Sequence, residues 1–189
     1  MPVYLALATL RLFSDCLCVS PGGFPSRVHC KLVRLCDFCY SAVIFPVSVF
    51  VGVTFWSLYV FDRQLVYPVW LDRIIPLWHN HILHTLPSLV VLVDTVLLRH
   101  RIPSRDLLAK MCVLISCAYY IIIFAVRYFQ GWWLYPVLGA LHSSYRLAFV
   151  SLLTLFFWFI YLLECGLNSL IWGVDDSKAK TEQGNLHLD

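Results

Sequence analysis

Four long apolar runs dominate the chain, and each is free or nearly free of charged residues. No Asp, Glu, Lys or Arg occurs in 38–61, 74–93 or 111–126, and Glu164 alone interrupts the run 147–172. A helix of about 20 mostly apolar residues crosses a lipid bilayer. The pattern therefore predicts an all-α fold, a polytopic transmembrane helix bundle. The predicted spans are 39–61, 77–98, 109–127 and 147–172.

The runs divide the chain into three parts. Residues 35–172 form the predicted membrane-embedded bundle, and the polar residues 173–189 are expected to be a disordered tail. Residues 1–34 form a separate N-terminal segment, whose apolar stretch contains Arg11 and Asp15. Each of these charges would cost roughly 2.5–3.5 kcal/mol at the middle of a bilayer. The sequence leaves open whether this segment also crosses the membrane.

The composition agrees with a bilayer as the main solvent. Hydrophobic residues make up 60% of the 189 residues, charged residues 13%, and the mean hydropathy is +0.77. Soluble domains carry about 25% charged residues, and one core of this size could not hide so much apolar surface. The net charge of +3 is small and scattered, so we expect membrane lipids rather than nucleic acid as partners.

The basic residues predict the orientation of the spans. Cytoplasmic loops carry an excess of Lys and Arg. The side that holds both termini contains Arg11, Arg27, Lys31, Arg34, Arg99, Arg101, Arg105, Lys110, Lys178 and Lys180. The opposite side contains Arg63, Arg73, Arg127 and Arg146. We therefore expect both termini in the cytoplasm, with the plasma membrane and the endomembrane system both open as locations.

The eight cysteines do not form the regular pattern of a disulfide framework. Several lie in predicted spans and the others lie on or near the cytoplasmic side, where thiols stay reduced. The pairs in "CLC" and "CDFC" have irregular spacing for zinc, so free or palmitoylated cysteines are favoured over a metal site. No cofactor is expected.

A cluster of histidines stands at the start of the second span, in "WHNHILHT". If 79–98 is helical, His81 and His84 share a face, and Thr95 lies about 20° from His84 around the axis. Pro87 frees a backbone carbonyl next to His84, and such a group needs a partner or a polar cavity inside a membrane. We predict that His84 faces a cavity in the bundle. His79 and His81 are also consistent with a simple polar entrance to the helix.

Two further readings concern polar residues near this cluster. The H-x-H-x-x-H spacing is similar to fragments of the histidine boxes of membrane di-iron enzymes, but the remaining histidines are too scattered to complete a metal site. Asp94 and Glu164 are expected to lie near an interface, each paired with a neighbour. Intramembrane ionisable residues are functional candidates by default.

Several motifs occur in an order that carries a family resemblance. The segments "FPVSVFVGVTFW", "YVFDRQLVYPVWLDRIIPLWHNHILHT", "IPSR", "GWWLYPVL" and "YLLECGLNSLIW" follow one another between about residues 33 and 172. They resemble the androgen-induced and androgen-dependent TFPI-regulating family of membrane proteins. That family looks like intramembrane hydrolases that cleave fatty acid esters of hydroxy fatty acids. The resemblance implies a threonine nucleophile on an early helix and a histidine base.

The resemblance assigns roles to one motif of this chain, W-x-N-H-x-x-H-T. It implies His84 as the general base, with Asn80, His81 and Thr85 in support. Residues 1–34 do not resemble the early family helices, so the nucleophile stays unassigned and we expect weak hydrolysis or none. The alternative is a non-catalytic membrane protein that binds lipids or partners. If the chain is active, the nearest candidate hydroxyls are those of Thr54, Ser88 and Thr95.

Overall fold

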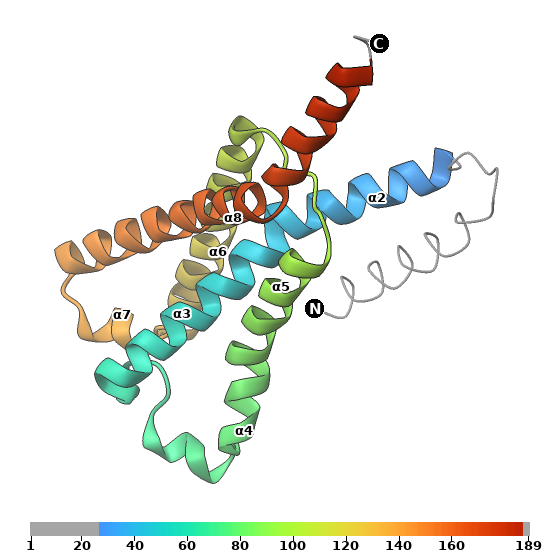
Figure 1. The fold of residues 1–189 in the computed structure, drawn as a ribbon. Coiled ribbons are helices and arrows are strands. Elements are labelled where there is room, and N and C mark those ends of the chain that lie inside the picture. The colour runs from blue at the N-terminus through green and yellow to red at the C-terminus, as the bar shows by residue number, and fades with distance from the viewer. Residues whose placement is uncertain (1–26, 187–189) are drawn as a thin grey trace.

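The computed structural model describes residues 27–186 of the chain, with side chains described for 31–173. All its regular elements are helices (Figure 1). In chain order they are α2 (Arg27–Cys39), η1 (Tyr40–Ile44), α3 (Phe45–Asp62), η2 (Arg63–Leu65), η3 (Val69–Arg73), α4 (Leu77–Asn80), η4 (His81–Thr85), α5 (Leu86–Leu97), α6 (Arg105–Gln130), α7 (Pro136–Ala140) and α8 (Ser143–Leu186).

The predicted all-α membrane bundle is confirmed. Four helical stretches within the described residues are long and apolar enough to cross a membrane. They are Lys31–Leu65, Leu77–Leu97, Arg105–Gln130 and Ser143–Gly173. Large apolar side chains on their outer faces are exposed, among them Val93, Ile121 and Leu152. Such surfaces suit lipid rather than water, and the chain is a multi-pass membrane protein.

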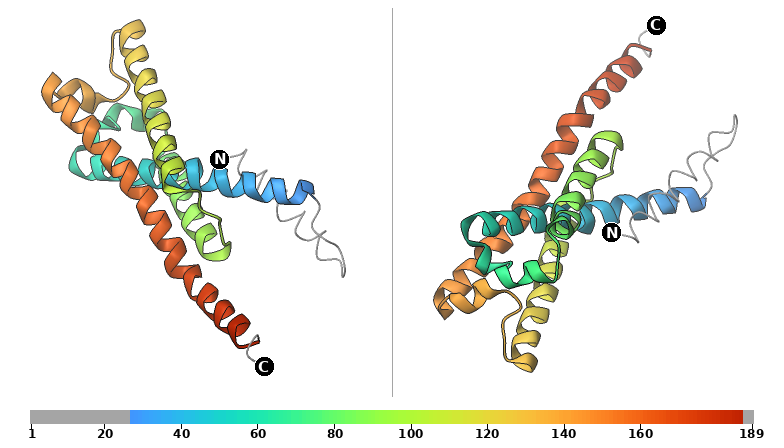
Figure 2. Two further views of the ribbon diagram at one scale, coloured as in Figure 1. Left: turned by 90° about the horizontal axis from the view of Figure 1, so that it is seen from above. Right: turned by 90° about the horizontal axis from the view of Figure 1, so that it is seen from below.

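Helix α3 is the central element of the bundle. It packs against both α5 and α8, and α6 packs against α8. The views from above and below show α6 and α8 crossing the rod formed by α2 and α3 (Figure 2). Phe50 of α3 contacts Phe156 and Phe157 of α8, which ties the first span to the last. The packing at the centre therefore depends on aromatic side chains.

Two prolines alter the helical path, and each follows a π-helical turn. The turn η1 immediately precedes Phe45 and Pro46, and η4 immediately precedes Leu86 and Pro87. Proline removes one helical hydrogen bond and crowds the carbonyl four residues earlier. A wider π turn is a common accommodation in such places, and often marks a functional site. The turn η4 carries His84.

The ends of two helices differ from the predicted ones. The first rod begins at Arg27, upstream of the span predicted at 39–61, because α2 runs into η1 and α3 without a break. Helix α8 continues to Leu186, beyond the end of the span predicted at 147–172. Its sequence "DDSKAKTEQ" contains Lys, Ala, Glu and Gln, which are good helix formers and allow a helix to continue beyond the apolar run.

Short connections on one side of the bundle are held by arginines. The Arg63 guanidinium donates two hydrogen bonds to the Asp72 carboxylate, at 2.8 and 2.9 Å. Arg146 donates to the carbonyls of Leu138 and Leu141, at 2.8 Å each, and lies over the ring of Trp133. Trp133 is therefore a partner of a positive charge on this side of the bundle.

Candidate functional site

A cavity of about 240 Å³ lies inside the bundle. Its walls come from α3, α6, α7 and α8, and from His84 on η4. Apolar side chains make up most of the lining, with a few hydroxyl groups from threonine, serine and tyrosine. The volume is close to the lower end of the roughly 300–1,000 Å³ typical of small-molecule sites. An apolar chain is the kind of ligand that such walls favour.

His84 lines this cavity, as the sequence predicted. Its ring stacks on Phe55 of α3, with ring centroids 3.7 Å apart and planes 4° from parallel. The Nδ1 atom is buried and has no hydrogen-bond partner among the described residues. The stacking on Phe55 thus holds the plane of the imidazole ring.

Gly52 permits the close approach of α3 to the turn that carries His84. A Cβ atom added at Gly52 would lie 2.6 Å from the backbone oxygen of His84 and would also clash with the Ser88 hydroxyl. Real Cβ atoms essentially never come this close to backbone. A glycine at this position therefore lets the two helices bring Phe55 and His84 into contact.

Thr54 is a second polar residue of interest in the cavity wall, and it is partly buried. It lies two residues after Gly52 and next to Phe55, both of which contact the turn that carries His84. Its hydroxyl oxygen is buried and has no hydrogen-bond partner in the described part of the chain. Thr54 and His84 thus both line one mostly apolar cavity, and each has a buried polar atom without a hydrogen-bond partner among the described residues.

The predicted supporting residues lie outside the cavity lining. His81 is exposed, stacks on Trp56 at 4.9 Å, and has its Nδ1 atom 3.1 Å from the Thr85 hydroxyl. Trp56 donates its indole N–H to the same hydroxyl at 3.0 Å. Asn80 is 3% exposed, and its amide nitrogen has no partner among residues 31–173. These side chains lie close to His84 in the sequence. They do not share a polar face with it inside the cavity.

Thr95 was predicted to lie on the same face of the helix as His84, but it does not line the cavity that His84 lines. Thr95 donates to the Val91 carbonyl at 2.8 Å and lies 2.6 Å from the Tyr40 hydroxyl oxygen. The uniform 100° per residue used for the projection does not hold through η4, because a π turn contains more residues than an α turn. The faces of the helix beyond η4 are therefore rotated relative to His84.

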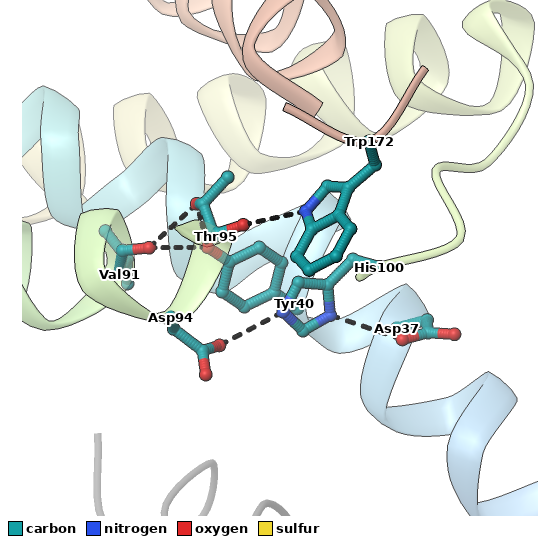
Figure 3. Close-up of polar contacts among 7 residues, drawn as sticks. All are labelled: Asp37, Tyr40, Val91, Asp94, Thr95, His100 and Trp172. Atoms are coloured by element: carbon teal, nitrogen blue, oxygen red, sulfur yellow. Dashed lines mark hydrogen bonds and ion pairs between the residues drawn. The ribbon is translucent and has the colours of Figure 1, made fainter. Parts of the chain in front are cut away.

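A second polar cluster lies at the other end of α5, and the sequence did not reveal it (Figure 3). His100 bridges two carboxylates, with Nδ1 3.2 Å from Asp37 and Nε2 3.1 Å from Asp94. The ring of Tyr40 stacks on His100 with centroids 3.7 Å apart. Trp172 donates its indole N–H to the Thr95 carbonyl at 3.0 Å. This cluster connects α2, α5, α8 and the loop before α6.

His100 lies outside the predicted spans, and its pKa is raised. Burial by itself lowers the pKa of this imidazole, but the hydrogen bonds and charges of Asp37 and Asp94 outweigh that effect. The pairing of Asp94 confirms the expectation for that residue. Glu164 is 1% exposed and lies beside Ser41, and neither carboxyl oxygen makes a well-formed hydrogen bond in the described region.

No group of three or more His, Cys, Asp or Glu side chains among residues 31–173 could hold a metal ion. The sequence could not reveal contacts between residues that are far apart in the chain. Asp37 and His100 are separated by 63 positions, and nothing in their local context indicates a contact. The cavity itself also arises only when α3, α6 and α8 converge.

Comparisons with known proteins give the relationship of the chain. The model of the FAR-17a/AIG1-like protein family matches residues 7–169. The human androgen-induced gene 1 protein is 36% identical over 154 residues, covering 81% of this chain and 63% of that protein. The human and rat androgen-dependent TFPI-regulating proteins are each 38% identical, covering 72% of this chain and 60% of theirs. A search of solved structures gave no significant match.

The family match begins upstream of the motifs that carried the resemblance. It starts at residue 7 rather than near residue 33, and so includes Thr9, which lies outside the described residues. The chain spans between 60% and 63% of the length of these relatives. The matched range contains the motifs quoted from the sequence, except for the last three residues of the final motif. The chain is an integral membrane protein that belongs to the FAR-17a/AIG1-like family.

Proposed function

We propose that this chain is a membrane-embedded carboxylic-ester hydrolase that acts on fatty acid esters of hydroxy fatty acids, with His84 as general base. The observation that carries the proposal is the position of His84. His84 lines a mostly apolar cavity inside the bundle, and its Nδ1 atom has no hydrogen-bond partner among the described residues. Histidine can take and return a proton near neutral pH.

The cavity supplies the other requirement of such a reaction. Its apolar walls, including Phe50, Leu58 and Phe157, suit an acyl chain. The ester group would then lie beside the polar atoms at one wall. A water-poor site also strengthens any hydrogen bond to charge that develops on the ester carbonyl.

Ester turnover by the full chain in liposomes tests this function. His84→Ala should lower turnover by about 100-fold or more, in the range measured for general bases. His79→Ala is the matched control, because His79 lies in the same motif but packs against Trp78 and does not line the cavity. Equal turnover by the unmodified chain and His84→Ala would exclude His84 from the reaction.

The second candidate function is acyl-chain binding without chemistry. The scarcity of polar groups in the cavity wall favours it, since few atoms are available to stabilise a charged intermediate. This function predicts saturable retention of a fluorescent fatty acid ester by the chain with no release of acid. Release of acid that depends on His84 would contradict it.

A further inference from the structure

We propose that Lys31, Arg34 and Arg101 bind the headgroup of an anionic phospholipid that carries a phosphomonoester, such as phosphatidic acid. Lys31 and Arg34 belong to α2, and Arg101 lies in the loop 98–104 that joins α5 to α6. None of these three residues lines the cavity that contains His84. The inference therefore does not depend on the proposed hydrolase.

The three cations have no partner of their own in the described part of the protein. Each side chain is exposed, and none forms a hydrogen bond or an ion pair within residues 31–173. Arginines on the opposite side of the bundle are different. Arg63 binds the Asp72 carboxylate, and Arg127 and Arg146 donate to backbone carbonyls. The basic side thus presents positive charge to its surroundings, and such a surface attracts anions.

A tertiary contact holds the loop 98–104 against α2 (Figure 3). His100 has its Nδ1 atom 3.2 Å from Asp37 of α2, and its ring stacks on that of Tyr40 with centroids 3.7 Å apart. Arg34 lies one helical turn before Asp37, on the same side of α2. Arg101 directly follows His100 in the chain. The contact therefore brings cations from two separate elements to one part of the surface.

The depth of this site matches the headgroup region of a bilayer. Arg34 precedes the predicted start of the first span, at residue 39, by about 7.5 Å along a helix axis. The headgroup region is roughly 5–8 Å thick in each leaflet. Arg101 lies in the loop that follows Leu97, the last residue of α5. Leu35, next to Arg34, is 49% exposed and can insert among acyl chains while the cations stay at the polar surface.

The chemistry of the three side chains favours a phosphomonoester over other anionic headgroups. A guanidinium group presents parallel N–H donors that match two phosphate oxygens. A phosphomonoester carries roughly 1.5–2 negative charges at neutral pH, whereas a phosphodiester headgroup, as in phosphatidylglycerol, lacks the second acidic proton. Three cations balance the larger charge better. Asp106 is the only acidic residue between 98 and 110, so acidic groups in this segment offset little of the positive charge.

Native mass spectrometry of the purified full chain in nonionic detergent, titrated with phosphatidic acid, measures the dissociation constant. Arg34→Gln and Arg101→Gln should each weaken binding about fivefold, and the two together about 25-fold, given the contribution of one cation at a membrane surface. Arg101→Lys keeps the charge but loses the planar donors, so its affinity should lie between those of the unmodified chain and Arg101→Gln. Arg73→Gln is the matched control, because Arg73 is exposed and lies in η3 on the opposite side.

Two further ligands identify the source of the phosphate. Phosphatidylglycerol with the same acyl chains should bind more weakly than phosphatidic acid, and an equal concentration of glycerol phosphate should not displace the lipid. Equal binding of the two lipids, or displacement by glycerol phosphate, would overturn the phosphomonoester lipid as the ligand.

The variants decide whether the three cations form the site. Unchanged affinity in the chain that carries both Arg34→Gln and Arg101→Gln, or an equal loss in Arg73→Gln, would overturn it. Unfolding temperatures in the same detergent show whether each variant folds. If the Gln variants do not fold, Arg101→Lys is compared with Arg73→Lys: weaker binding in Arg101→Lys alone supports the site, and unchanged binding in both overturns it.

Discussion

Single residues decide how the His84 turn is held. Phe55 fixes the plane of the imidazole by stacking, and Gly52 fixes the distance between α3 and the backbone that carries it. Neither residue needs to react for the site to depend on it. At the opposite end of α5, His100 has a comparable structural role, because it joins carboxylates from two separate elements.

Gly52→Ala should separate α3 from η4. The added Cβ would lie 2.6 Å from the His84 carbonyl oxygen, so backbone must move rather than a flexible side chain. We expect a loss of about 1–3 kcal/mol in the free energy of unfolding, the usual cost of overpacking. Thermal unfolding in detergent measures it. Gly166→Ala in α8 is the control, because its Cβ would meet nothing within 4 Å; equal effects of both substitutions would contradict the close approach.

Stability should depend on pH through His100. Its pKa is raised in the folded chain, since the carboxylates of Asp37 and Asp94 outweigh the opposing effect of burial. The folded state therefore binds the proton more tightly than the unfolded state. The contribution is complete below the ordinary histidine pKa of about 6.5 and is lost as pH rises through the raised value.

Unfolding temperatures measured in detergent between about pH 5.5 and 8.5 test the contribution of His100 across that window. The unmodified chain should lose stability as pH rises, whereas His100→Gln should start less stable and change less with pH. Parallel curves for the two proteins would show that another group governs the pH dependence.

At the scale of the elements, the two proline-associated π turns shape the bundle. Pro46 disturbs the hydrogen bond that would otherwise use the Ala42 carbonyl. The Tyr161 hydroxyl of α8 donates to this carbonyl at 2.7 Å, across 119 positions of sequence. A backbone defect in the first span is thus satisfied by a side chain of the last span. Inside a membrane, where water is absent, such a partner is required.

Tyr161→Phe should lower the stability of the bundle, because it removes the donor to the Ala42 carbonyl. Removing the hydroxyl leaves the buried Ala42 carbonyl without this donor, and an unsatisfied buried polar group costs about 1–3 kcal/mol. The unfolding temperature in detergent should fall accordingly. Tyr145→Phe is the matched control, because Tyr145 is 70% exposed. A Tyr161→Phe protein as stable as this control would show that the interhelical bond contributes nothing measurable.

At the scale of the whole molecule, the four spans separate two sides of the bundle. One side carries most of the Lys and Arg residues, and on the other Arg63 and Arg146 hold the connecting loops. The distribution of Lys and Arg predicts cytoplasmic termini. A glycosylation acceptor inserted between residues 66 and 76 should therefore be modified in microsomes, and one inserted after Gly173 should not. Modification of the second site alone would mean that the bundle has the opposite orientation.

The sequence by itself determined the fold class and the approximate spans, because hydrophobic length and the absence of charge decide what can cross a bilayer. It also pointed to His84, since an ionisable residue is costly in an apolar segment. Only the tertiary structure decided which polar groups meet. The pairing of Asp37 with His100, the burial of Glu164 and the cavity shared by Thr54 and His84 depend on helices far apart in the chain. Hydrophobic periodicity specifies a helix and its faces. The contacts between helices depend on π turns, on close packing at glycines and on the angles at which helices cross, and periodicity does not encode these features.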